Sequence, residues 1–101
     1  MIDMIKLQGK YNNGKTEVFY NGLKLSLEES LKISKLSPTG FSWGYLGSGP
    51  SQLALAVCVE HYGKAKGGVV LIYKKFMAEV IANLNHQEDF DILLNSDLMI
   101  C

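Results

Sequence analysis

The stretch from Gly40 to Ala56 constrains the fold of this chain more than any other part of it. It contains the only Trp, Trp43, and four of the ten glycines, and it passes through Pro50 into an apolar run. Glycines ahead of a Pro-led apolar run predict a tight turn that leads into a helix, because Pro suits the first helical turn, where its missing N–H has no intrahelical partner.

The apolar run predicts a helix that is buried on all sides, since every residue from Leu53 to Val59 is apolar. We expect this helix to begin at Pro50, with Ser48 or Gly49 as its cap. It should end near residue 62, where Gly63 can adopt the left-handed conformation that terminates helices.

The first quarter of the chain predicts three antiparallel strands, near residues 4–11, 16–20 and 23–25. Residues 16–20 are rich in β-branched and aromatic side chains, and Asn-Gly pairs stand on both sides of them, at 13–14 and 21–22. Asn-Gly favours the type I′ turn of a two-residue hairpin, because that turn needs two positive φ angles. A sheet this small needs another layer to pack against.

Two further helices are expected. Ser26 and Glu29 have the spacing of a capping box and predict a short helix through about Lys35, which Pro38 would terminate. Apolar side chains with helical spacing predict a second helix from Val69 to Leu84, on a stripe formed by Val69, Ile72, Tyr73, Phe76, Val80 and Leu84. The alternative for residues 69–73 is a strand, and residues 90–92 alternate weakly, as an edge strand would.

These elements predict the α+β class: a small antiparallel β meander packed on two antiparallel helices, in a single domain that covers residues 1–101. No apolar run approaches the length that spans a bilayer, and the first residues lack the features of a signal peptide. We therefore expect a cytoplasmic protein without membrane contacts.

The charge composition argues against nucleic-acid binding. Ten lysines balance ten acidic residues, and the chain contains no Arg. Proteins that bind DNA or RNA usually carry a basic excess and use Arg on phosphates and guanines. A small anionic ligand stays compatible with this composition, since backbone N–H groups and one or two lysines can hold it.

The glycine-rich stretch is the candidate site, because a helix start exposes free N–H groups that favour an anion, and aromatic rings nearby can stack on a base. The predicted ligand-binding residues are Trp43, Tyr45, Gly47, Ser48, Gly49, Ser51 and Gln52. In the alternative interpretation, the glycines only allow a tight turn that packs the aromatic rings onto the helices.

Familiar catalytic motifs do not fit this chain. Residues 47–52 lack the third Gly of a dinucleotide fingerprint and the Lys of a phosphate-binding loop, and Leu46 stands where a nucleophile elbow needs Gly. Cys58, His61, His86 and Cys101 have irregular spacing for a zinc site. We therefore predict no catalytic residue, no metal and no cofactor, and the sequence favours a binding protein over an enzyme without deciding between them.

The block from Ser37 to Ala56 resembles an uncharacterised domain-of-unknown-function family of short bacterial and phage proteins. Residues 73–84 are similar to a second, weaker block of that family. The resemblance implies an α+β domain that is often encoded in mobile or viral genomes, and it assigns no catalytic residues.

Two functions follow as hypotheses. The first is a non-enzymatic protein that holds a small anionic or nucleotide-like ligand at the glycine-rich loop. A more specific form of this hypothesis is an anti-defence protein that sequesters a nucleotide signal, as a sponge would. The second is a protein-interaction module or inhibitor, in which the same loop or a strand edge binds a host protein. A homo-oligomer is compatible with both, and a small enzyme such as a nuclease fits least.

Overall fold

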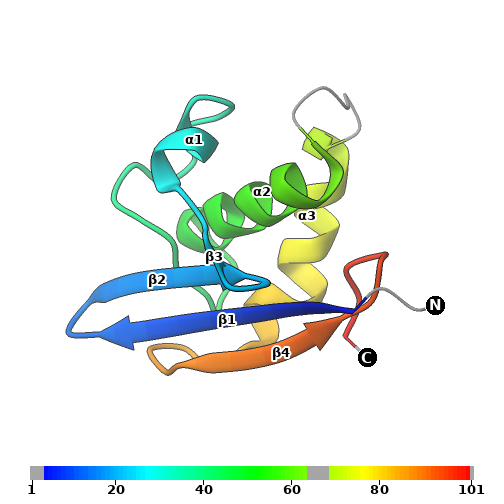
Figure 1. Cartoon of the computed structure of the whole chain (residues 1–101). Coiled ribbons are helices and arrows are strands. Elements are labelled where there is room, and N and C mark those ends of the chain that lie inside the picture. The colour runs from blue at the N-terminus through cyan, green and yellow to red at the C-terminus, as the bar shows by residue number, and fades with distance from the viewer. Residues whose placement is uncertain (1–3, 64–68, 101) are drawn as a thin grey trace.

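The computed structural model describes residues 4–63 and 69–100, and of residues 69–72 the backbone only. Its sheet has four antiparallel strands in the order β3-β2-β1-β4 (Figure 1). They span β1 Ile5–Asn12, β2 Lys15–Tyr20, β3 Leu23–Lys24 and β4 Phe90–Leu94. The antiparallel α+β class predicted from the sequence is therefore confirmed.

Two Asn-Gly turns fold the first three strands into a meander. Asn13 and Asn21 both have φ of 49°, and Gly14 and Gly22 both have φ of 83°. Two consecutive positive φ angles are the signature of a type I′ turn, whose twist matches that of the flanking strands. The predicted strand positions are thus confirmed to within about two residues, an ordinary uncertainty at element ends.

The predicted edge strand is also confirmed. β4 lies beside β1, with Leu94 opposite Ile5 and Phe90 opposite Gly9. Gly9 leaves room for the ring of Phe90, which lies where a side chain at position 9 would stand. The N-terminal hairpin and the C-terminal part of the chain therefore form one sheet.

Helix α1, Leu27–Leu31, begins as the capping box predicts and ends earlier than expected. The Ser26 hydroxyl accepts a hydrogen bond from the Glu29 N–H at 3.2 Å. The predicted continuation to Lys35 is wrong, because the backbone of residues 34–37 bonds instead to the side-chain amide of Gln52.

Helix α2, Ser48–Tyr62, begins two residues before the predicted start. Gly47 is its N-cap, so the assignment of Ser48 or Gly49 as cap is wrong. Pro50 occupies the third helical position, which is still in the first turn. Backbone N–H groups in this turn have no intrahelical acceptor, so the helix loses no hydrogen bond because Pro lacks an N–H. The end of α2 is as predicted, at Gly63 with φ of 89°.

Helix α3, Val69–Glu79, excludes the alternative strand at residues 69–73. The predicted helix to Leu84 is too long, since a short 3-10 helix, η1 Ile81–Asn83, follows after Val80. The Asn83 side chain donates to the Glu79 carbonyl at 2.8 Å and so satisfies one of the last acceptors of α3. Tyr73, Phe76 and Val80 are buried, as the stripe predicts, while Val69 and Ile72 lie outside the described side chains.

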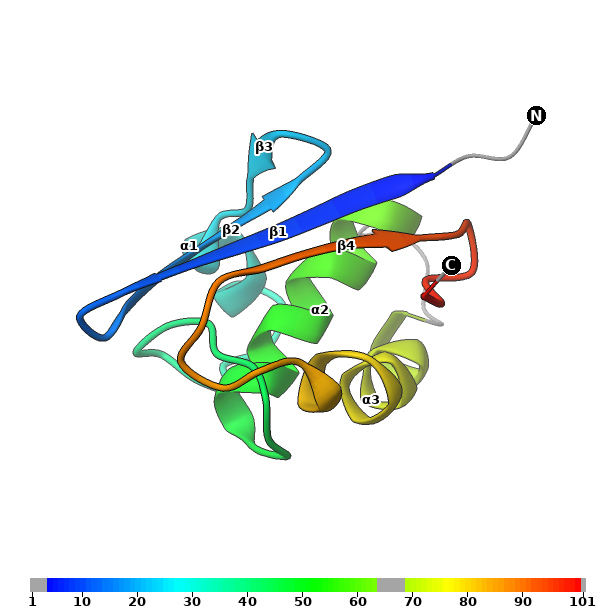
Figure 2. The ribbon, with the colours of Figure 1, turned by 90° about the horizontal axis from the view of Figure 1, so that it is seen from below.

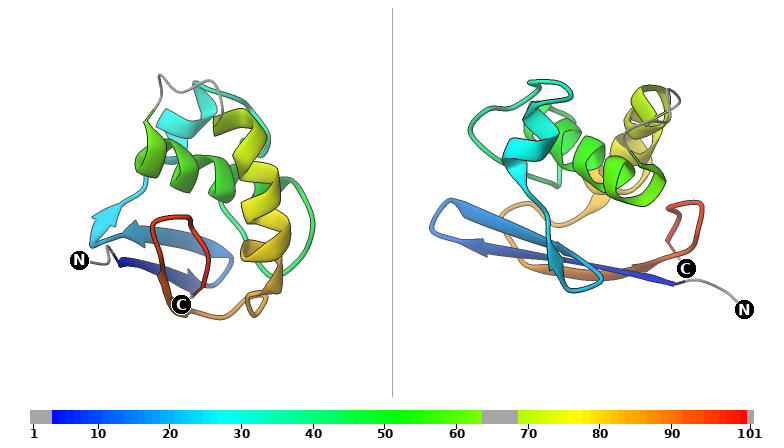
Figure 3. Two further views of the ribbon diagram at one scale, coloured as in Figure 1. Left: turned by 90° about the vertical axis from the view of Figure 1, so that its right-hand side faces the viewer. Right: turned by 45° about the horizontal axis from the view of Figure 1, so that its top comes forward.

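The described helices cover one face of the sheet, as the view from below shows (Figure 2). Helix α2 lies between α1 and α3 and contacts both (Figure 3). The core forms where α2 faces the sheet, and its fully buried large side chains include Leu7, Val18, Trp43, Leu53, Leu55, Val57, Ile81 and Leu94. No helix in residues 4–63 and 69–100 has the length and apolar character needed to cross a membrane.

A substitution at Gly22 tests the hairpin. Gly22→Val should lower the free energy of unfolding by about 1–3 kcal/mol, because a β-branched residue resists the positive φ of this turn. Gly22→Asn is the matched control and should be much milder, since Asn tolerates the left-handed region. Equal melting temperatures for Gly22→Val and the parent would contradict the turn assignment.

A substitution in α3 tests the core stripe. Phe76 is 4% exposed, so Phe76→Ala should lower the free energy of unfolding by ~3–5 kcal/mol in urea denaturation. Lys75→Ala, at an exposed neighbouring position, should change it by less than about 0.5 kcal/mol. A Phe76→Ala protein as stable as its parent would remove this face from the core.

Candidate ligand-binding groove

Trp43 anchors the loop between α1 and α2 to the segment that precedes β4. Its side chain is 1% exposed, and its indole N–H donates to the Glu88 carbonyl at 2.9 Å. The Phe90 ring meets the indole edge-on, with centroids 4.8 Å apart and planes at 82°. A large ring with a satisfied polar atom fixes the position of the residues on both sides of it.

Gly44 and His86 make the next contact between the same two segments. The Gly44 N–H donates to the Ile81 carbonyl at 2.9 Å. Gly44 has φ of 87°, and a Cβ at this position would stand 2.5 Å from the backbone nitrogen of His86. Only glycine combines this conformation with so close an approach.

The orientation of the His86 ring follows from its hydrogen bond. Nδ1 lies 3.0 Å from the Trp43 carbonyl oxygen, which can only accept, so Nδ1 carries the hydrogen. In the neutral ring, Nε2 is then left as an acceptor. The sequence offers His86 only as one member of an irregularly spaced zinc set, because no local pattern links it to a residue 43 positions earlier.

Tyr45 lies over the start of α2. Its ring meets the His86 ring edge-on at 5.1 Å. A Cβ at Gly47 would stand 2.6 Å from the ring of Tyr45, and one at Gly49 would stand 3.1 Å from its hydroxyl oxygen. These two glycines therefore allow the ring to pack on the backbone, as the packing interpretation of the sequence requires.

The start of α2 carries no side-chain cap. Gly47 has no side chain, and the Ser51 hydroxyl donates to the Gly47 carbonyl at 2.8 Å instead of accepting from the backbone. The Ser48 side chain is exposed beside it. The first N–H groups of the helix thus keep the weak positive potential of a helix start.

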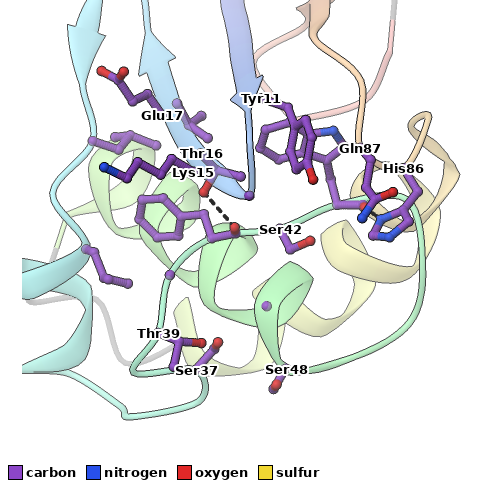
Figure 4. A pocket seen from close by; sticks show the side chains of 18 of the residues that line it. Tyr11, Lys15, Thr16, Glu17, Ser37, Thr39, Ser42, Ser48, His86 and Gln87 are labelled. Carbon is purple, nitrogen blue, oxygen red and sulfur yellow. Dashed lines mark hydrogen bonds between the residues drawn. The ribbon is translucent and has the colours of Figure 1, made fainter.

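These parts border a groove of about 1150 Å³ between the β1–β2 hairpin and the loop that leads into α2 (Figure 4). Four of the predicted ligand-binding residues line it: Trp43, Tyr45, Ser48 and Gly49. Gly47, Ser51 and Gln52 are absent from its lining. The further lining includes Tyr11, Lys15, Thr16, Glu17, Lys24, Glu28, Thr39, Phe41, Ser42, His86 and Gln87.

One hydrogen bond crosses the groove. The Thr16 hydroxyl donates to the Phe41 carbonyl at 2.7 Å and ties the hairpin to the loop. Lys15 and Glu17 lie on one side of this bond, and Tyr11, Ser42 and His86 lie on the other (Figure 4). We call the second side the ring side, defined by Tyr11, Ser42, Tyr45, His86 and Gln87.

Gln52 is fully buried and joins α2 to the loop after α1. Its amide oxygen accepts from the N–H groups of Leu36 and Ser37 at 2.7 and 2.8 Å. Its amide nitrogen donates to the Ser30 hydroxyl at 2.8 Å and to the Ser34 carbonyl at 3.2 Å. The amide is therefore occupied by internal hydrogen bonds that hold Ser37, the start of the groove-lining loop.

His61 belongs to a different part of the molecule. Its Nε2 donates to the Ser96 carbonyl at 2.6 Å, which leaves Nδ1 to accept from the Tyr20 hydroxyl at 2.8 Å. Burial above all, and then the charges of Glu60 and Tyr62, raise the pKa of Tyr20, so this phenol keeps its proton for the bond. His61 thus ties β2 and the turn after β4 to the end of α2.

The cysteine chemistry considered in the sequence is not favoured. Burial raises the pKa of the Cys58 thiol to about 12, so it remains protonated near neutral pH. Among the described residues, no group of three or more His, Cys, Asp or Glu side chains could hold a metal ion. Cys101, Lys64 and Lys66 lie outside the described residues.

Comparison with known proteins identifies the family of the chain. Residues 7–98 match the model of DUF6166, a family of unknown function, and the chain belongs to that family. Neither the curated proteins nor the solved structures give a significant match. The function must therefore be argued from the groove itself.

Removal of the Gln52 amide tests how the groove wall is held. Gln52→Leu should lower the free energy of unfolding by about 1–3 kcal/mol, because the buried Ser37 N–H loses its acceptor. The Ser37 amide should also exchange its hydrogen much faster, as NMR can measure residue by residue. Lys35→Leu, an exposed control in the same loop, should change neither quantity. Unchanged protection of Ser37 in Gln52→Leu would contradict the assigned role.

Proposed function

We propose that this member of DUF6166 is a non-enzymatic protein that binds a small anionic, nucleotide-like ligand in the groove. The observation that carries the proposal is that the Tyr45 ring contacts His86 and its hydroxyl approaches Gly49, in a groove that Ser48 also lines. A groove of this kind combines aromatic rings with hydroxyl, imidazole and backbone N–H groups, which are the groups that hold a base and its phosphate.

The start of α2 and the ring side would offer distinct contacts to the two parts of such a ligand. The anionic group would meet the Ser48 hydroxyl and the first N–H groups of α2, where the helix dipole favours negative charge. A ring would lie against the partly exposed Tyr45, since Trp43 is buried. Trp43 would then report binding through its fluorescence rather than provide the stacking surface.

The setting of the family suggests a biological use for such binding. We propose that the chain is of bacterial or phage origin, as its sequence resemblance implies. A small phage protein that binds a nucleotide can act as a sponge for a signal of host defence. We propose this anti-defence role as a sharper version of the same binding function, in the host cytoplasm.

A second candidate function rests on Leu46. Its side chain is 70% exposed at the tip of the turn between Tyr45 and Gly47. Two hydrogen bonds hold the turn, one on each side. The Gly44 N–H donates to the Ile81 carbonyl, and the Ser51 hydroxyl donates to the Gly47 carbonyl. An aliphatic side chain can anchor an interface by filling a pocket of the partner, so the loop would bind a host protein or a second copy of the chain.

Nucleotide binding should be visible in fluorescence and in thermal stability. Phosphate-bearing nucleotides should quench Trp43, the only indole of the chain. At a ligand concentration about a hundredfold above Kd, binding adds ~2.7 kcal/mol to the free energy of unfolding. In a domain of this size, that raises the melting temperature by about 10 °C or more.

Ser48→Ala should weaken this binding about five- to tenfold without loss of stability, since it removes one exposed hydroxyl. Ser96→Ala is the matched control, because Ser96 is exposed and does not line the groove. A screen of mono-, di- and cyclic nucleotides that gives neither quenching nor a thermal shift would reject the nucleotide function.

The second candidate is tested by Leu46→Asp. An exposed side chain contributes little to folding, so the variant should melt within about 2 °C of the parent. It should lose the host protein that the parent retains on an affinity column, whereas Leu23→Asp, at another exposed leucine, should keep it. Equal retention by the parent and Leu46→Asp would exclude Leu46 as an anchor.

A further inference from the structure

The edge of the sheet at β2 is paired over only part of its length. β3 contains two residues and β2 contains six, and β3 pairs with Phe19 and Tyr20. One more bond follows, from the Leu25 N–H to the Val18 carbonyl at 2.8 Å, before the chain leaves the sheet for α1 (Figure 1). Among the described residues, the first half of β2, residues 15–17, therefore has a strand neighbour on the β1 side only.

The alternation of hydrogen bonds along β2 shows which backbone groups face this open edge. In an antiparallel strand, the N–H and the carbonyl of one residue point to the same neighbour, and those of the next residue point to the other. The Val18 carbonyl accepts from the β3 side, so the backbone groups of Thr16 face that side as well. The Thr16 hydroxyl bonds to Phe41, but the Thr16 N–H and carbonyl have no hydrogen bond partner among the described residues.

The open edge forms a wall of the groove. It lies on the side of the Thr16 bond where Lys15 and Glu17 are seen, away from the ring side (Figure 4). Leu25 and Leu27, which follow β3 in the chain, line the groove as well. This side of the groove thus combines an unpaired N–H and carbonyl with apolar side chains. An extended peptide uses both, since its main chain bonds to a strand edge and its alternate side chains enter pockets.

We propose that an extended segment of a partner protein binds here as an added strand, antiparallel to β2 and in line with β3. Its central residue exchanges two backbone hydrogen bonds with Thr16. Because residues directly opposite each other share a face of the sheet, the side chain of this central residue lies on the face of Thr16, toward Leu25 and Leu27. Its neighbours lie on the solvent face, so the segment carries an apolar residue between polar ones.

This inference does not depend on the proposed nucleotide, which would occupy the ring side and the start of α2. The two sites lie on opposite sides of the Thr16 bond to Phe41. A protein that fails to bind nucleotides can therefore still bind the peptide, and the reverse also holds.

Hydrogen exchange in the free protein, followed by NMR, tests whether the edge is open. The Thr16 amide should exchange nearly as fast as that of an unstructured peptide. The Glu17 amide is the internal control and should exchange at least about a hundredfold more slowly, because Glu17 pairs with Lys10 of β1. Equal protection of both amides would overturn the proposal, and protection of Thr16 that rises with protein concentration would assign the edge to a second copy instead.

A random heptapeptide library displayed on phage supplies the probe. The peptide selected on the full chain should slow exchange at Thr16 by about tenfold or more at saturation. N-methylation of the peptide, one residue at a time, should weaken binding about tenfold at the residue that donates to the Thr16 carbonyl and only slightly at its two neighbours. Failure to select a peptide, selected peptides that leave Thr16 unprotected, or tolerance of N-methylation at every position would each overturn the proposal.

Two substitutions at one position separate the backbone donor from the side chain. Thr16→Pro removes the N–H at an edge position, where a strand tolerates Pro, and Thr16→Val removes the hydroxyl bond to Phe41 but keeps the N–H. Affinity for the selected peptide should fall about tenfold in Thr16→Pro and stay within about threefold in Thr16→Val. Equal affinities in the two variants would overturn the assigned role of the Thr16 N–H. If circular dichroism shows Thr16→Pro to be unfolded, the N-methylation series decides the question.

Discussion

The burial of Trp43 is the interaction on which the candidate site depends. The loop between α1 and α2 has no regular structure around this residue, so its path is set by where the indole is held. The indole packs on Phe90 and donates to the Glu88 carbonyl, while the neighbouring Gly44 N–H bonds to the Ile81 carbonyl. Residues from two distant parts of the chain thereby form one wall of the groove, and the Thr16 bond to Phe41 fixes the opposite hairpin against them.

Local patterns in the sequence were enough to predict most of the fold. Each Asn-Gly turn and the Ser26 cap depend on residues within four positions of one another, and their physics is the same in any context. Element lengths were predicted less well, because they depend on tertiary contacts. The predicted helix through Lys35 ends early since Gln52 takes over the hydrogen bonds of residues 34–37.

The candidate site was predicted only in part, for the same reason. Trp43, Tyr45, Ser48 and Gly49 are neighbours in the sequence, and the helix start that groups them is a local feature. Tyr11, Thr16 and His86 reach the groove through strand pairing and through the packing of Trp43, neither of which leaves a short-range signal. Gln52 was chosen for its polar side chain near a helix start, whereas its four hydrogen bond partners come from the α1 region, 15 to 22 residues earlier.

The packing role and the ligand role of the glycines do not exclude each other. Gly47 and Gly49 let the Tyr45 ring lie against the start of α2, where a larger residue would push it away. The same contact keeps a partly exposed aromatic ring at the edge of the groove and leaves the first turn of α2 without a side-chain cap. The packing of the aromatic rings accounts for Gly44, where His86 approaches, and for Gly47 and Gly49, which lie beside the Tyr45 ring. The packing of Trp43 and Tyr45 is therefore compatible with the proposed binding role for this end of α2, and it would be the structural precondition of that role.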